Sequence, residues 1–426
     1  MTGLRGRGKI IGGLWLLMLL VLPGMMVATA TEVKLSFVHW FGAREPYRTQ
    51  LAELIAHFEA QHPSIQVEQV NGDTDKIKTL IAGGAAPDVM ALRSQAWGPL
   101  VTDVSLDITD LMKRDRIDPS AYRPGSMQAV HINGRYYGLP WTPGYNMMYV
   151  NRTLLYNVGA EAPGRGWTLD ILKSLAQKTT RDLNGDGTID QWGFRGGHYS
   201  KPSYYWPYLN GGRIMDEATG ELTVMDNRVI DALQWWTDLK NEHDAMDTGG
   251  GSTDRFLNGK AAFMDLWEAP RTLFLDQKMH ETYSWAIIDL PTGAGPTINF
   301  SLTHPLAIAR DSKHHAEAWE FLRFFGTEGQ QVLGDNGFFP LTRASIRRMV
   351  QKTPLPPGHS EQDIFGPLIN PAGVPISHPF FLPGFAEVWA EVEKAWTRTV
   401  TQNLSVRVAL EAALPAMQAA IASGGN

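Results

Sequence analysis

VKLSFVHW, at residues 33–40, is the first of three short runs from which the fold can be predicted, and IQVEQV (65–70) and PDVMAL (87–92) are the other two. Each is a short apolar or alternating run bounded by turn residues, which is typical of a strand. Apolar residues recur at helical spacing over 51–58 and again over 77–81. The order strand, helix, strand, helix, strand predicts an α/β fold with a mainly parallel sheet.

In an open parallel sheet, ligands bind outside the carboxyl ends of the strands. Here the first predicted strand ends at Trp40 and is followed by Phe41, and the third is followed by Arg93 and Ser94. We therefore expect these four residues to border a ligand site. The alternative, that Trp40 is an ordinary core residue at a strand end, stays open.

The rest of the chain continues the alternation without an internal repeat. Further strands are expected over 147–150, up to Phe263 and over 306–309. Thr168 and Asn227 are each placed to cap a helix, because Thr and Asn side chains can accept hydrogen bonds from the first free backbone N–H groups of a helix.

The N-terminus has the three parts of a cleavable signal peptide. A basic segment with Arg5, Arg7 and Lys9 precedes an apolar run over 10–21, and Ala28-Thr29-Ala30 offers a cleavage site. The apolar run is too short to span a bilayer. We therefore expect residues 1–30 to be removed on export, which leaves about 395 residues, enough for two domains.

Composition narrows the class of protein further. The sequence has no cysteine, which excludes disulfides and a lipid anchor on an N-terminal cysteine, so the periplasm is the expected compartment. Its formal net charge is −6, without the clustered basic face that nucleic-acid binding needs. The 14 Trp residues stand out, because many aromatic residues fall beside Gly and Pro at predicted strand ends.

Taken in order, the motifs of the chain resemble those of the family 1 extracellular solute-binding proteins, the maltose-binding-protein type. The resemblance covers essentially all of the chain after residue 30. Its parts are the strand that ends at Trp40, then FEAQHPSIQV (58–67), AGGAAPDV (82–89), GRYYGLPWTPGYNMMY (134–149), GWTL (166–169), FLNGKAAFM (256–264), AWEFLRFF (318–325) and GFFP (337–340).

The resemblance implies a type II periplasmic-binding-protein fold, with two discontinuous α/β lobes and a ligand cleft between them. The N-terminal lobe would comprise residues 31–139 and 301–340, and the C-terminal lobe residues 140–300 and 341–426. It also implies the function: a periplasmic, non-enzymatic protein that binds a sugar or oligosaccharide and delivers it to the permease subunits of an ABC importer. No cofactor is required, and we expect a monomer.

The same resemblance suggests further cleft residues. Aromatic side chains can stack on the apolar faces of sugar rings, and polar ones can hydrogen-bond to the hydroxyl rims. The aromatic candidates besides Trp40 are Trp141, Tyr145, Trp206 and Trp267, and the polar candidates besides Arg93 and Ser94 are Asp265 and Ser301. For Trp206, which stands in a run of aromatic residues next to Pro207, simple packing stays an alternative.

DLNGDGTID (182–190) matches the front of a calcium-binding loop. Gly193 stands where the closing bidentate Glu belongs, so the match is partial, and a polar turn without metal is the alternative. If calcium binds, it is structural. Its ligands would be Asp182, Asn184, Asp186, Thr188, Asp190 and Gln191.

Two other functions stay open. A binding protein for glycerol 3-phosphate, glycerophosphodiesters or polyols would need several cations in the cleft, for which Arg44, Arg93 and Arg195 are available. An exported carbohydrate-active enzyme would need two carboxylates facing each other across the cleft. No pattern in the sequence places such a pair.

Overall fold

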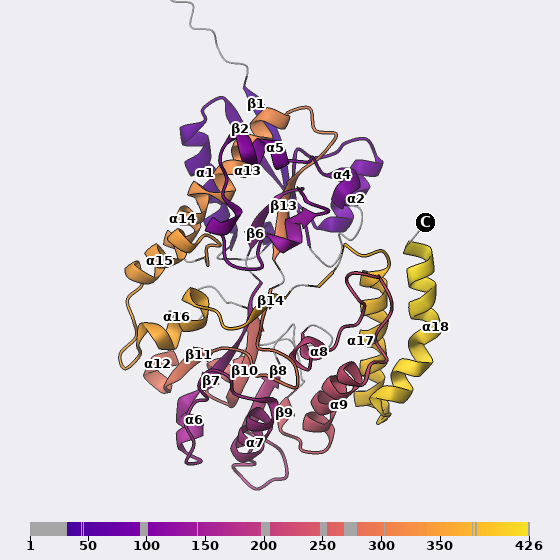
Figure 1. Ribbon diagram of the computed structural model, residues 1–426. Coiled ribbons are helices and arrows are strands. Elements are labelled where there is room, and N and C mark those ends of the chain that lie inside the picture. Colours follow the sequence, from indigo (N-terminus) through magenta and orange to yellow (C-terminus); the bar gives the residue numbers. More distant parts are fainter. Residues whose placement is uncertain are drawn as a thin grey trace, which may run out of the picture.

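The computed structural model has two α/β lobes, the first at the top of Figure 1 and the second below it. The predicted signal peptide lies outside the described residues. These are residues 32–43, 45, 47–93, 101–142, 144–196, 205–247, 254–267, 279–301, 303–336, 338–376, 378–379 and 381–424.

The first lobe is built on a five-stranded sheet in the order β2-β1-β3-β13-β6. β1 pairs in parallel with both β2 and β3, whereas β13 runs antiparallel to its two neighbours. The mainly parallel sheet predicted from the sequence is thereby confirmed. The bounds are β1 Val33–His39, β2 Ile65–Asn71, β3 Val89–Ala91, β6 Leu139–Thr142 and β13 His304–Ile308.

Successive side chains of β1 point to opposite faces of this sheet. Phe37 is buried on one face, where its ring centroid lies 5.4 Å from that of Phe321, and Val38 is buried on the other face beside Ile77. The helices that cover the two faces are α1 Tyr47–Gln61, α2 Thr74–Ala82, α4 Val101–Val104, α5 Thr109–Arg114, α13 His315–Gly326 and α14 Glu328–Asp335.

The second lobe repeats the plan with the order β11-β7-β10-β8-β9. Here β7 is the antiparallel strand, and β8 pairs in parallel with β9 and β10. The strands are β7 Asn146–Asn151, β8 Trp192–Gly196, β9 Met246–Asp247, β10 Ala261–Trp267 and β11 Trp285–Ile288. Of its helices, α7 Leu169–Thr179, α9 Asn227–Asn241, α17 Phe385–Gln402 and α18 Val406–Gly424 pack on one face, and α10 Asp254–Leu257, α12 Met279–Thr282, α15 Arg343–Lys352 and α16 Glu361–Ile369 on the other.

Helix caps agree with the sequence in one case and differ by a residue in another. Thr168 caps α7 by accepting from the N–H of Ile171, as predicted. At α9 the cap is Asp226, whose side chain accepts from Arg228, and Asn227 is the first helical residue. Asp and Asn are equally good caps, so sequence preference alone does not choose between neighbours.

The described residues show three crossings of the chain between the lobes. It passes from β6 to β7 between Thr142 and Asn146, returns from β12 (Ile298–Phe300) to β13, and leaves again between α14 and α15. Beside these crossings, β12 pairs with β14 (Val374–Ile376) in a small parallel sheet (Figure 1). Among the described residues, no helix combines the length and the hydrophobicity that crossing a bilayer requires.

Candidate functional site

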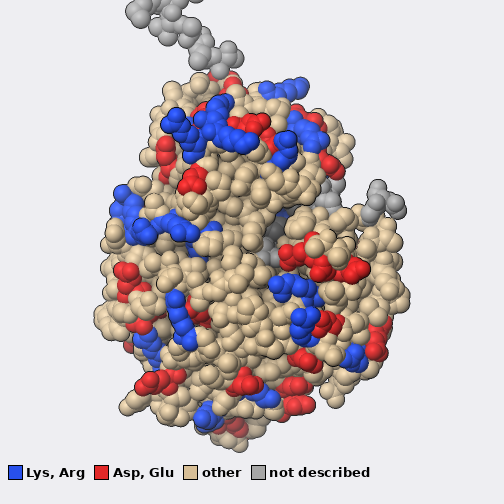
Figure 2. All heavy atoms as spheres, viewed as in Figure 1, with Lys and Arg blue, Asp and Glu red and all other residues tan. Residues whose placement is uncertain are grey.

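In such folds, ligands bind at the edge of each sheet where its parallel strands end, and here these two edges face each other. β6 ends at Thr142 and β7 begins at Asn146, so these two ends lie close together. His304, the first residue of β13, pairs with Thr142, and Trp267, the last residue of β10, pairs with Asn146. The carboxyl ends of the parallel strands in both lobes therefore border one space, and Figure 2 shows the surface hollowed between the lobes.

On the first lobe, three of the predicted residues come together at this edge. Trp40 is half-buried, with its ring centroid 5.6 Å from that of Phe41. The guanidinium carbon of Arg93 lies 4.5 Å from the centroid of the Trp40 ring, a cation–π contact. Together they form a half-exposed surface that is aromatic on one part and donates hydrogen bonds on another.

His304 completes this edge, and the sequence did not mark it as a site residue. Its ring meets Trp40 edge-on, at a centroid distance of 5.2 Å. Burial, helped by the positive charge of Arg93, lowers the pKa of His304 to about 3. The imidazole is therefore neutral at pH 7, so the charge on this edge comes from Arg93.

On the second lobe, the edge carries a buried polar network. Asp265 is fully buried, and the Tyr205 hydroxyl donates to its Oδ2 at 2.5 Å. Burial, and then the charge of Asp265, raises the pKa of Tyr205 well above its usual value. Next to this pair, Arg195 donates to the backbone carbonyl of Asp247 at 3.0 Å, and its Nε lies 3.5 Å from the Asp247 carboxylate.

The charged side chains of this network are fixed by contacts with one another. Asp247 also forms an ion pair with Arg255, whose guanidinium carbon lies 3.7 Å from the centroid of the Trp192 ring. Burial lowers the pKa of Arg195, and the Asp247 charge partly offsets that effect. Asp265 was predicted from the sequence. Its partner Tyr205 lies 60 positions away, and only its place in the aromatic run next to Trp206 hinted at it.

Four other predicted residues are buried. Trp141 is 3% exposed and packs against Phe37 and Phe325 in the first core. Ser301 is 1% exposed and shares a 2.7 Å hydrogen bond with Thr303.

Tyr145 has no exposed surface, and its hydroxyl donates to the Pro124 carbonyl at 3.0 Å. Trp206, also fully buried, stacks on Trp235 with ring centroids 5.2 Å apart. The structure therefore favours the packing alternative for Trp206, and none of the three aromatic side chains exposes a ring face in this structure.

Two predicted residues cannot be placed. Ser94 lies outside the described residues, and of Trp267 only the backbone at the end of β10 is described. Both residues stay predictions.

The predicted calcium loop is closed by its own hydrogen bonds. Asp182 accepts from the N–H groups of Gly185 and Gly187 at 2.7 and 2.8 Å. These donors, Gly187 first, lower the pKa of Asp182. Asp190 likewise accepts from Leu183 at 2.9 Å. Among the residues that the structure describes, no three acidic or histidine side chains are grouped to hold a metal, so the loop carboxylates are not gathered around a common point in this structure.

We therefore expect calcium to leave thermal stability unchanged. The protein, treated with EDTA and dialysed, should melt at the same temperature with and without millimolar calcium, because the loop carboxylates already have backbone donors. A rise of several degrees with calcium, absent in an Asp182→Asn variant, would contradict this expectation and restore the calcium prediction.

Comparison with known proteins agrees with this architecture. An ABC substrate-binding protein from Listeria monocytogenes in complex with cycloalternan superposes with a TM-score of 0.74 at 20% identity, covering 92% of this chain and 99% of that one. UgpB from Mycobacterium tuberculosis in complex with glycerophosphocholine also gives 0.74, at 16% identity and with 92% and 98% coverage. At such identities the likeness shows the fold alone, which confirms the type II binding-protein fold.

Sequence comparison identifies the family. An uncharacterized lipoprotein of Streptomyces antibioticus is 24% identical over 293 residues, which make up 64% of this chain and 62% of that protein. The match thus spans less than two thirds of the lipoprotein. The family model described as bacterial extracellular solute-binding protein matches residues 44–332, well over half of the chain. The chain belongs to the family of bacterial extracellular solute-binding proteins.

Proposed function

We propose that the solute is a sugar or oligosaccharide, bound between the two lobes and passed to the permease subunits of an ABC importer. The observation that carries the proposal is the half-exposed indole of Trp40 with Arg93 beside it, at the edge of the first sheet. A sugar ring has an apolar face that can stack on an indole, and hydroxyl groups that can accept from a guanidinium.

The opposite edge supports the same class of ligand. Asp265 is a buried acceptor oriented by Tyr205, and Arg195 is a buried donor oriented by Asp247. Polar groups held in this way favour ligands whose hydroxyls match them, because a ligand without such hydroxyls leaves them unsatisfied. Closure of the two lobes on the ligand would bring both sets of groups to it.

A phosphorylated ligand is the main rival, and the fold does not decide against it, since a neighbour of equal similarity binds glycerophosphocholine. The charges favour a neutral sugar. Arg195 and Arg255 share Asp247, which leaves Arg93 as the cation without a carboxylate partner among the described residues of the two edges. One such guanidinium suits hydroxyls better than the doubly charged phosphate of glycerol 3-phosphate. A phosphodiester carries only one negative charge, so it stays the stronger of the phosphorylated alternatives.

The acidic residues at the site are consistent with a protein that binds its ligand without catalysing a reaction. Asp247 and Asp265 stand on the same lobe, and each is engaged by a neighbouring side chain. A glycosidase needs two carboxyl groups on either side of the scissile bond. We further propose that the protein acts as a monomer in the periplasm, after removal of residues 1–30.

A thermal-shift screen over neutral sugars, polyols, sugar acids and glycerol phosphates tests the ligand class. We expect a neutral sugar or oligosaccharide to raise the melting temperature by several degrees and to bind with a micromolar or lower dissociation constant by calorimetry. A ligand that binds only when phosphorylated would overturn the choice of sugar. Release of shorter products from an incubated oligosaccharide, followed by chromatography, would overturn binding without chemistry.

A further inference from the structure

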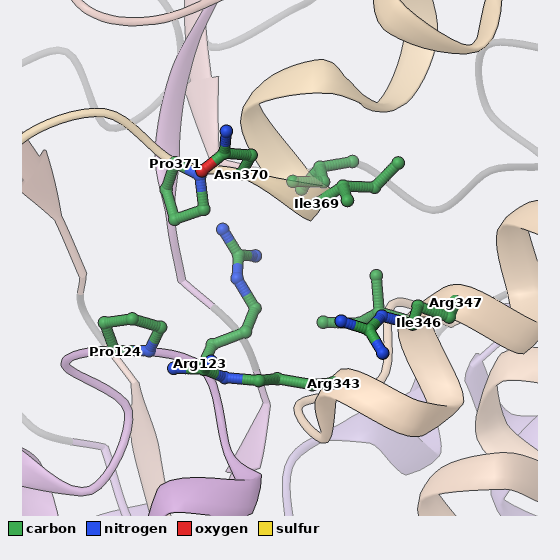
Figure 3. A pocket seen from close by; sticks show the side chains of 9 residues that line it. Arg123, Pro124, Arg343, Ile346, Arg347, Ile369, Asn370 and Pro371 are labelled. Atoms are coloured by element: carbon green, nitrogen blue, oxygen red, sulfur yellow. The ribbon is translucent and has the colours of Figure 1, made fainter.

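A second cavity, of about 180 Å³, lies beside the interlobe crossings. Arg123 and Pro124 of the first lobe line one side, and residues of α15 and of the end of α16 line the other (Figure 3). Three of its nine lining residues are arginines, namely Arg123, Arg343 and Arg347, and none of the nine carries a carboxylate. The side chains that line the cavity therefore bring positive charge and no negative charge of their own.

The fold fixes Arg123 at the point where the crossings meet. Its N–H donates to the carbonyl of Leu341 at 2.9 Å, which ties it to the segment that enters α15. Its guanidinium carbon lies 3.6 Å from the centroid of the Tyr145 ring, on the crossing between β6 and β7. Arg123 is only 4% exposed, so its charge is held in place rather than dispersed in solvent.

Arg343 and Arg347 extend this charge from the second lobe. They are four positions apart on α15 and so lie on the same helix face, where like charges repel. Arg343 is also the first residue of the helix, at the positive end of its dipole. Their helix is anchored to the second lobe by Met349 and Val350, which are buried with Trp285.

Arg348, the next residue on α15, differs from Arg343 and Arg347 because it has a carboxylate partner. Arg348 is not among the residues that line the cavity and pairs with Asp335 at 3.1 Å, and Lys352 joins the same carboxylate at 2.9 Å. Among the described residues, Arg343 and Arg347 have no such carboxylate: Arg343 donates at 3.4 Å to the Tyr122 carbonyl, and both extend toward the same space as Arg123 (Figure 3).

We propose that this cavity binds a small oxyanion such as phosphate, separately from the solute cleft. Guanidinium groups bind oxyanions through paired, charge-assisted hydrogen bonds, and an anion relieves the repulsion between Arg343 and Arg347. Arg123 belongs to the first lobe and the other two to the second. The bound anion links the lobes next to the crossings and so favours one interlobe angle over others.

Titration with sodium phosphate tests the proposal on the full chain without sugar, against sodium chloride at equal ionic strength. We expect phosphate to raise the melting temperature saturably and to give a measurable dissociation constant by calorimetry. Arg343→Gln/Arg347→Gln should weaken phosphate binding about tenfold or more. Arg347→Gln alone, at an exposed position, serves if the double variant folds poorly.

Arg348→Gln is the matched control, because it removes a charge from the same helix but outside the cavity; it should bind phosphate like the wild type. Arg93→Gln should also leave phosphate binding unchanged, which separates this cavity from the solute cleft. The proposal is overturned if phosphate acts no differently from chloride, if the double variant responds like the wild type, or if phosphate binding disappears with Arg93.

Discussion

Replacing Trp206 by alanine is expected to lower the free energy of unfolding by about 4 kcal/mol, because it empties the space of a fully buried indole. The ring is held between Trp235, at a centroid distance of 5.2 Å, and Phe194, at 6.0 Å, in the core of the second lobe. Chemical denaturation followed by far-UV circular dichroism measures the loss. Folded Trp206→Ala protein should retain most of its affinity for the solute.

Trp206→Phe is the control for this prediction, since a smaller aromatic ring keeps part of the packing and should cost clearly less stability. The opposite pattern, with stability near the wild type and a large loss of affinity, would mean that Trp206 reaches the ligand. It would then be a stacking platform, as the aromatic run of the sequence first suggested.

Replacing Trp40 by alanine is expected to have the opposite balance of effects, with a large loss of affinity for the solute and a small loss of stability. Affinity for the solute should fall by roughly 30-fold, which corresponds to about 2 kcal/mol, the size typical of a tryptophan at the centre of a binding site. The loss of stability should be smaller than for Trp206→Ala, because the Trp40 ring is only half-buried. Isothermal titration calorimetry with the best sugar from the screen measures the affinity.

Tyr156→Ala is the matched control for an exposed aromatic residue. Tyr156 is 81% exposed and lies in α6 (Arg152–Tyr156), at the far end of β7 from the site, so its loss should change neither affinity nor stability by much. If Trp40→Ala binds the solute as tightly as Tyr156→Ala does, the proposed stacking surface is wrong and the solute is held elsewhere in the cleft.

Features of the fold that depend on neighbours in sequence were predictable. Strands and helices alternate because apolar residues recur at two different periods, and the strand ends at Trp40 and Arg93 follow from where those runs stop. The Thr168 cap is equally local, since its partner Ile171 is three positions away. These local features also placed Trp40, Phe41 and Arg93 at one sheet edge.

Contacts between distant residues were not predictable in this way. Trp206 and Trp40 each stand beside another aromatic residue in the sequence, yet Trp206 is covered by Trp235 from α9 and Trp40 is left half-exposed. Tyr145 likewise lies beneath Arg123, a contact that brings a loop of the first lobe onto a crossing.

The alternation of strands and helices, the family and the aromatic edge of the first sheet follow from the amino-acid sequence alone, because each depends on residues a few positions apart. Which aromatic side chains remain accessible, and which arginines come together, depends on how the chain folds. Tyr205 meets Asp265 across 60 positions, and Arg343 meets the Tyr122 carbonyl across 221. Burial and charge at a site are set by such long-range contacts, which the folded chain creates and local sequence does not record.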